Sequence, residues 1–168
     1  MSNDLSHDEK IEKLDKLIRD IGICMFTTVD ADTGKLHSRP MAVQGGLDGH
    51  DLYFFSYRDS AKMDDVQDTV KVNCAFSCPK DQHYVSVEGD ARMTFDRAKM
   101  EEKWDASLNA WFGKGLDTPG ICMIAVRVGD AQYWDAPNNT LIHLYGMAKA
   151  ALTGESVKDA GENEKVSM

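Results

Sequence analysis

Residues 37–62 read HSRPMAVQGGLDGHDLYFFSYRDSAK. Strand-forming residues occupy both halves, and between them residues 47–50 contain the pair Asp-Gly, which is typical of a tight turn. We therefore expect one strand from Lys35 to Val43 and another from Asp51 to Tyr57. The end of the stretch predicts a short helix that begins at about Ser60.

On both sides of this stretch, the sequence predicts further strands with short helices between them. Ser6 and Glu9 form a capping-box pattern before an amphipathic helix over residues 7–20. Further strands are expected at 21–29, 70–77, 84–95 and 121–128, with Ala131 to Trp134 as the hairpin partner of the last one. Helices are expected from Asp96 to about Trp111 and from Leu141 to Leu152, and residues 153–168 are expected to form a disordered tail.

The order of these elements predicts the fold class. Six to seven antiparallel strands with mostly hairpin connections indicate a mainly β protein, a closed β-barrel with helical additions, and not a doubly wound parallel sheet. The 168 residues suffice for one ordinary domain, which we place at residues 1–152.

The composition narrows the functional classes. The chain is 42% hydrophobic and 28% charged, as in ordinary globular proteins, and its net charge of −9 disfavours nucleic acid and anionic membranes as partners. It contains no apolar run of membrane-spanning length and begins with polar residues, so we expect a cytoplasmic protein with free cysteines. Cys74 and Cys78 are a single pair, which matches a zinc site poorly, and no metal site is predicted.

One candidate binding residue lies on the strand before the turn. Alternation places His37, Arg39 and Met41 on one face of this strand. Pro40 cannot donate a ladder hydrogen bond, so it belongs on an edge strand or at a bulge. The planar guanidinium of Arg39 suits a phosphate. The alternative is an exposed edge-strand Arg with an ion-pair partner.

A second candidate cluster surrounds the expected helix start. Ser56 and Ser60 supply hydroxyl groups, and Lys62 places a cation in the first helical turn. A cation there is unfavourable for the helix itself, but it is favourable if an anion binds between it and the free N–H groups. The alternative is an ordinary Ser cap followed by a surface Lys.

Together these segments resemble the pyridoxamine 5′-phosphate oxidase-like split barrels, and most closely the bacterial general stress protein branch. The resemblance extends from Leu14 to Gly154. Its motifs are Ser38-Arg39-Pro40-Met41, Phe54-Phe55-Ser56, Ser60-x-Lys62, Tyr84-Val85-Ser86-Val87-Glu88-Gly89, Tyr133-Trp134-Asp135 and Leu144-Tyr145-Gly146-x-Ala148-Lys149-Ala150. Their order and spacing, more than any single motif, carry the resemblance.

The resemblance implies a homodimer with two FMN sites at the subunit interface, the cofactor being FMN in preference to FAD or a deazaflavin. By position it assigns the phosphate to Ser56, Ser60 and Lys62, and the phosphate or the flavin edge to Arg39. It assigns contacts with the flavin to Met41, Phe55 and Tyr84, and it places Trp134 in the partner's site.

The chain departs from the true oxidases after Trp134. The resemblance implies an Arg and a His there that grip the phosphate of the vitamin, whereas here Asp135-Ala136-Pro137-Asn138-Asn139-Thr140 follows without a cation. His143 lies nearby but comes without the Arg. We therefore do not expect a true pyridoxamine 5′-phosphate oxidase.

The functional hypothesis is an FMN-binding general stress protein that acts as a flavin-dependent oxidoreductase on an unidentified small molecule. No residue is assigned as catalytic. The alternative is a non-catalytic, stress-protective flavin-binding protein, because no acid or base is evident near the flavin. A third hypothesis, a related barrel that holds a deazaflavin or haem, lacks an axial-ligand signature for haem.

Overall fold

The structure is a computed structural model that describes residues 5–59, 70–135 and 162–168. Its elements in chain order are α1 (His7–Ile21), β1 (Ile23–Val29), β2 (Leu36–Ala42), β3 (Asp51–Tyr57), β4 (Val70–Cys78), β5 (His83–Thr94), α3 (Arg97–Lys103), the 3-10 helices η1 (Ala106–Ala110) and η2 (Gly115–Asp117), β6 (Ile121–Asp135) and β7 (Glu162–Ser167).

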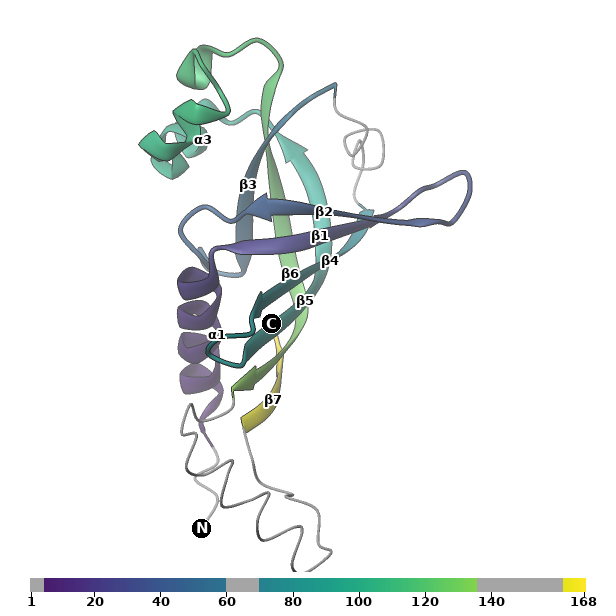
Figure 1. The fold of residues 1–168 in the computed structure, drawn as a ribbon, viewed down its shortest axis with the longest axis vertical. Coiled ribbons are helices and arrows are strands. Elements are labelled where there is room, and N and C mark those ends of the chain that lie inside the picture. The colour runs from purple at the N-terminus through teal and green to yellow at the C-terminus, as the bar shows by residue number, and fades with distance from the viewer. Residues whose placement is uncertain (1–4, 60–69, 136–161) are drawn as a thin grey trace, which may run out of the picture.

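The strands of the described residues form one antiparallel sheet in the order β2-β1-β4-β5-β6-β3, with β7 paired to the second half of β6. The two ends of this order meet where Val43 bridges Phe54, so the sheet curls into a barrel that closes at this bridge. Figure 1 shows β1 and β2 crossing the long β5 and β6 ribbons, with α1 and the α3 segment at opposite ends. The fold is a split barrel, as the sequence predicted.

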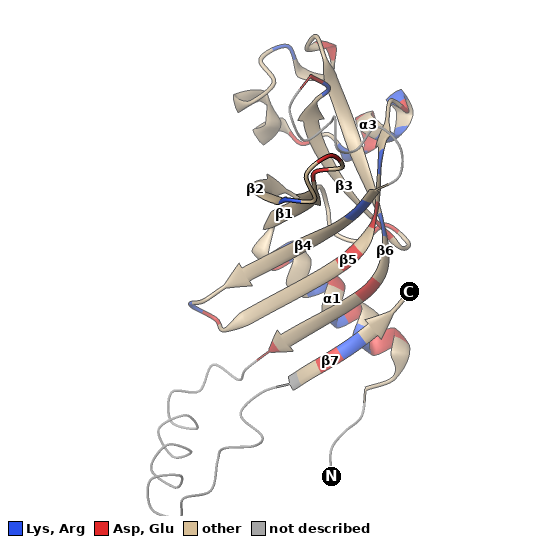
Figure 2. Ribbon diagram, turned by 90° about the vertical axis from the view of Figure 1, so that its right-hand side faces the viewer, with Lys and Arg blue, Asp and Glu red and all other residues tan. Residues whose placement is uncertain are grey.

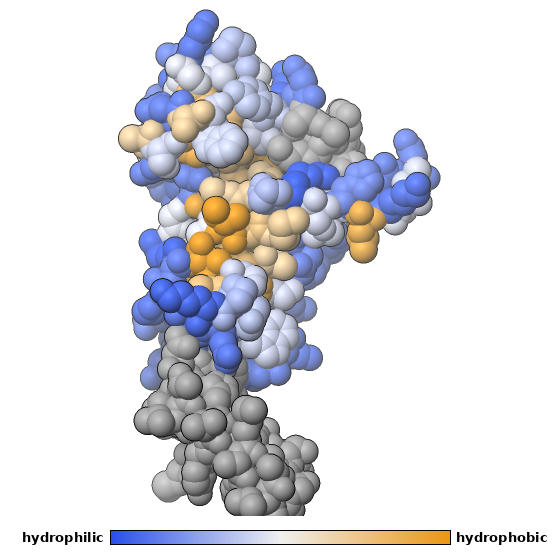
Figure 3. All heavy atoms as spheres, in the orientation of Figure 1, coloured by the Kyte–Doolittle hydropathy of each residue, from blue (hydrophilic) through white to orange (hydrophobic). Residues whose placement is uncertain are grey.

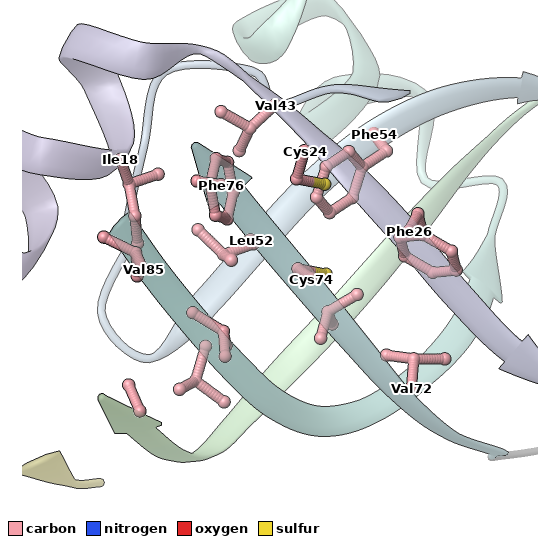
Figure 4. Packing of buried hydrophobic residues seen from close by; sticks show 14 of the residues in the cluster. Ile18, Cys24, Phe26, Val43, Leu52, Phe54, Val72, Cys74, Phe76 and Val85 are labelled. Atoms are coloured by element: carbon pink, nitrogen blue, oxygen red, sulfur yellow. The ribbon is translucent and has the colours of Figure 1, made fainter. Parts of the chain in front are cut away.

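The barrel interior is filled by the inward side chains of the strands. On β1, Cys24 and Phe26 are buried while Ile23 and Met25 are exposed, which is the alternation of a strand with one solvated face. Phe26 meets Phe54 of β3 edge to face, with 5.4 Å between ring centroids (Figure 4). α1 packs three buried aliphatic side chains against this core.

A second, smaller core lies on the outer side of β3 and β6. Phe55 contacts the rings of Trp104 and Phe112 there, at centroid distances of 5.2 and 6.3 Å. Met100 of α3 and Leu108 of η1 complete this cluster. The helical segment after β5 is therefore fixed to the wall of the barrel.

The sequence predictions were correct for elements that depend on interactions between residues close together in the chain. The amide of Glu9 donates to the Ser6 hydroxyl at 3.3 Å, and the Ser6 amide donates to the Glu9 carboxylate at 2.8 Å, so the predicted capping box begins α1. β3 has the predicted bounds. Pro40 lies on β2, the edge strand of the sheet order.

The predicted hairpin at Ala131 to Trp134 is wrong, because these residues continue β6 as one strand of 15 residues. β5 pairs with both halves of β6, and the register shifts by one residue between Glu88 and Gly89. Gly129 and Asp130, whose composition is typical of a turn, lie at this bulge within the strand. Pairing with a distant strand therefore overrides the local turn propensity.

Two further predictions need correction. The predicted disordered tail, 153–168, is wrong for its end, because residues 162–167 form β7, whose Val166 is buried in the barrel core. Ion pairs from Lys10 to Glu164 and from Lys13 to Asp135, at 2.9 and 2.8 Å, join α1 to β7 and β6 (Figure 2). A strand with a single buried side chain leaves little apolar pattern to detect.

The predicted helix from Asp96 to about Trp111 ends at Lys103, where Asp105 caps the separate 3-10 helix η1. The predicted helix start at Ser60, the helix Leu141 to Leu152 and His143 lie outside the described residues. No helix in the described part of the chain is long and apolar enough to cross a membrane.

Candidate functional site

A pocket opens where β2 and β3 separate. The two strands are bridged at Val43 and Phe54, and farther out, toward Pro40 and Tyr57, no ladder joins them in the described residues. The gap is walled on a third side by η1 and encloses about 340 Å³, a volume typical of small-molecule sites. The lining residues are Ile23, Pro40, Met41, Ala42, Gln44, Phe55, Ser56, Tyr57, Leu108, Trp111 and Phe112.

Three residues that the resemblance assigned to FMN line this pocket: Met41 and Phe55, expected at the flavin, and Ser56, expected at the phosphate. Met41 projects from the inner face of β2, opposite Cys24 of β1. Phe55 and Ser56 are successive on β3, so their side chains leave opposite faces of the strand. All three side chains are buried, which gives the pocket a fixed wall.

Arg39 lies beside the pocket and not in its lining. It precedes Met41 by two residues on the same face of β2, a separation of about 7 Å along a strand. Its half-buried guanidinium donates to the hydroxyl of buried Thr28 at 3.1 Å, which differs from the exposed Arg of the alternative interpretation. Ser60 and Lys62 lie outside the described residues, so the phosphate cluster stays a prediction.

Tyr84 and Trp134 lie next to each other, but outside the pocket. They are direct partners on β5 and β6, and their half-exposed side chains share the outer face of the sheet. Only β4 separates β5 from β1, whose Ile23 lines the pocket, which puts Tyr84 on the order of 10 Å from that wall. Within the described residues of one chain, neither side chain lines the pocket.

The pocket also contains residues that the sequence did not single out. Gln44 is buried, and its amide nitrogen donates to the carbonyl of Ala42 at 3.1 Å. The hydroxyl of Tyr57 donates to the carbonyl of Trp111 at 2.7 Å and so ties the end of β3 to η1, 54 positions along the chain. The adjacent aromatic pair Trp111-Phe112 was the available signal, but its place beside β3 depends on tertiary folding.

Every lining residue in the described part of the chain is uncharged. Two lysines of α3 are engaged by a carboxylate: Lys99 and Lys103 each lie 3.0 Å from Asp48, and their hydrogen bonds lower the pKa of Asp48. A hydrogen bond with Cys24, together with burial, raises the pKa of the Cys74 thiol, which therefore stays protonated. The described lining thus offers a ligand no carboxylate, imidazole, amine or thiol, and the described residues hold no cluster of potential metal ligands.

A split barrel with an apolar pocket at its seam is a small-molecule-binding architecture. The family model of the pyridoxamine 5′-phosphate oxidase like proteins matches residues 9–158, and the chain belongs to this family.

Known relatives are similar over most of the chain. Protein bli-3 of Neurospora crassa is 29% identical over 160 residues, covering 88% of this chain and 75% of that protein. A structure from Xanthomonas citri, called a general stress FMN/FAD binding protein, is 26% identical with a TM-score of 0.67, covering 79% of this chain and 92% of that one. A structure from Jannaschia sp. CCS1 that carries the name general stress protein 26 has the same fold, with a TM-score of 0.77, 21% identity and coverage of 96% and 99%.

Proposed function

We propose that this protein binds FMN, with the flavin ring in the pocket between β2 and β3 and the phosphate beside Arg39. The observation that carries the proposal is the convergence of Met41, Phe55 and Ser56 on one pocket. The name of the Xanthomonas citri relative supports a flavin ligand.

The residues present fit the chemistry of FMN. The ring is largely apolar, and Met41 and Phe55 supply apolar surface, while the unladdered edges of β2 and β3 carry main-chain N–H and C=O groups that can recognise its polar edge. Arg39, two residues before Met41 on β2, would hold the phosphate with Ser56, Ser60 and Lys62.

We propose a flavin-dependent oxidoreductase that acts on a small molecule. Bound FMN would supply reversible hydride and electron transfer, and the protein would orient the ring and exclude water from the pocket. The alternative, a non-catalytic flavin-binding protein, is supported by the lack of a carboxylate, imidazole, amine or thiol in the described lining. Reduction of the bound flavin by NADH or NADPH, followed by reoxidation by a substrate, would favour the enzyme.

The proposed site is completed by a second copy of the chain. Neither Tyr84 nor Trp134 lines the pocket of its own chain among the described residues, so we assign their contacts with the flavin to the site of the partner subunit. Ile23 and Met25 of β1 are exposed apolar residues that a partner would bury. Figure 3 shows a hydrophobic patch in the middle of the face that it draws.

The binding proposal is tested by titrating FMN into the apoprotein and following the loss of flavin fluorescence. Arg39→Ala and Lys62→Ala should each raise the dissociation constant roughly ten- to 150-fold, because each removes a charge-assisted hydrogen bond worth about 1.5–3 kcal/mol. Lys16→Ala, which removes an exposed cation of α1, is the control and should leave the constant unchanged. Unchanged affinity in both test variants would refute the phosphate assignment.

A further inference from the structure

We propose that the substrate taken up beside the flavin is an uncharged, planar aromatic molecule, and that Trp111 selects it. This inference rests on the proposed function, because it assigns the substrate class of the same pocket. It follows from the support of Trp111, from the charge of the lining and from the position of Gln44.

Trp111 presents a large apolar ring to solvent on a fixed main chain. The residue is 76% exposed, yet its amide donates to Leu108 at 2.9 Å and its carbonyl accepts the Tyr57 hydroxyl at 2.7 Å. Its neighbour Phe112 is buried in the second core. The indole therefore stands at the pocket edge without collapsing onto the protein, which suits it to stack against a flat ligand.

The described lining residues select against a charged ligand. A phosphate or carboxylate that enters the pocket would lose its hydration without meeting a cation among the described lining residues. An uncharged ring loses little hydration and gains contact with Leu108, Trp111 and Phe112 of the η1 wall.

Gln44 adds one fixed polar contact. Its amide nitrogen is held by the Ala42 carbonyl at 3.1 Å, so its amide oxygen can accept a hydrogen bond in the pocket. A ring that carries hydroxyl or amino groups satisfies this oxygen without bringing a formal charge. A ring carbonyl can accept instead from the second N–H of the same Gln44 amide, because Ala42 engages only one of the two.

The test compares two probes that differ in charge, 1,4-naphthoquinone and 1,4-naphthoquinone-2-sulfonate, by calorimetric titration of the FMN-loaded, oxidised protein. The uncharged probe should bind at least tenfold more tightly. Trp111→Ala should weaken that binding by about three- to tenfold through the lost ring contact. Phe95→Ala is the matched control, because Phe95 is also an exposed aromatic, 53% accessible, but lies outside the pocket lining.

Trp111→Arg distinguishes ligand selection by Trp111 from a purely structural role, because only selection predicts a change in the preferred probe. The residue is exposed, so the cation is tolerated, and the preference should shift toward the sulfonate. Equal or tighter binding of the sulfonate by the natural protein, or unchanged affinities in both Trp111 variants, would overturn the proposal. A Trp111→Ala variant that dissociates into monomers with its probe affinity intact would do the same, because a second copy would then be what covers the indole.

A protein that does not bind FMN would give a result that can be distinguished from a wrong substrate class. If FMN does not bind, the same probes are titrated into the protein without FMN. Binding that prefers the uncharged probe and depends on Trp111 would keep the substrate class, whereas absence of such binding would overturn it.

Discussion

Gly89 shows how one residue shapes the barrel. It lies at the bulge where β5 shifts its register against β6, and a Cβ added there would approach the carbonyl oxygen of Arg127 to 2.4 Å. That oxygen belongs to the main chain of a central strand, so it cannot move aside cheaply. The bend that lets β6 pair with β3 in its first half and with β7 in its second half passes through this contact.

Gly89→Ala should therefore destabilise the fold by more than about 2 kcal/mol, because the added methyl group must displace backbone. Urea unfolding followed by circular dichroism measures the change in the free energy of unfolding. Gly113→Ala is the control: nothing lies within 4 Å of a Cβ at Gly113, and its stability should change by less than about 0.5 kcal/mol. Equal effects of the two substitutions would contradict the close approach at the bulge.

At the scale of elements, α1 depends on its first turn. The backbone and side-chain hydrogen bonds of Ser6 lower the pKa of Glu9, so the folded state favours the ionised carboxylate. This contribution to stability is present above the unfolded-state pKa and is lost as the pH falls through the lower pKa of the folded state.

Ser6→Ala should lower the free energy of unfolding by about 1 kcal/mol near pH 7, as for other lost N-caps. Part of the loss of stability between neutral and acidic pH should disappear with it, because the hydroxyl contact that lowers the pKa of Glu9 is gone. Ser77→Ala, at an exposed serine of β4 that bonds no carboxylate among the described residues, should have little effect at any pH. Identical pH profiles for Ser6→Ala and the natural protein would show that the Ser6 hydroxyl does not act on Glu9.

The elements that the sequence predicted correctly are those fixed by interactions between residues close together in the chain. The capping box of α1 and the Asp-Gly turn before β3 act within a few residues, and both predictions were correct. β6 and β7 depend on pairing with distant strands, so a turn was assigned inside one and disorder to the other. The site divides in the same way: Met41 and Phe55 stand in strand motifs, whereas Trp111 reaches the pocket by tertiary packing alone.

At the scale of the whole molecule, we predict a homodimer with a mass of twice 18.7 kDa by light scattering at micromolar concentration. An interface that encloses two flavins should bury more than about 2,000 Å². A monomer under these conditions would refute the prediction and, with it, the assignment of Trp134 to the partner's site.

Subunit mixing tests the shared site directly. Arg39→Ala and Trp134→Ala should each weaken FMN binding in their own homodimers, because each removes one contact from both sites. In a refolded one-to-one mixture, half of the dimers carry both variants, and each of these has one intact site, so about a quarter of all sites should regain the natural affinity. No recovery would place Arg39 and Trp134 at the same subunit's flavin, or Trp134 at none.

The last prediction concerns a reaction that the molecule as a whole does not support, the oxidation of pyridoxamine 5′-phosphate. Asp135 follows Trp134 where a phosphate would need a cation, but the structure shows Asp135 paired with Lys13 at 2.8 Å and with His83 at 3.0 Å. Its repulsion of a phosphate is therefore weaker than the roughly 4 kcal/mol of a bare pair of like charges at 4 Å. Arg127 is likewise engaged, 3.0 Å from Asp51.

The stronger obstacle is the uncharged lining of the pocket, which leaves a phosphate dianion without a counter-ion among the described lining residues. With FMN-loaded protein, oxygen and pyridoxamine 5′-phosphate, we expect a kcat/KM for aldehyde formation below about 10⁴ M⁻¹s⁻¹, the lower end for ordinary enzymes. Gln44→Lys, which brings a cation to the pocket, should raise this value if charge is the missing element. A natural protein already above that value would show that a cation from elsewhere in the dimer reaches the substrate phosphate.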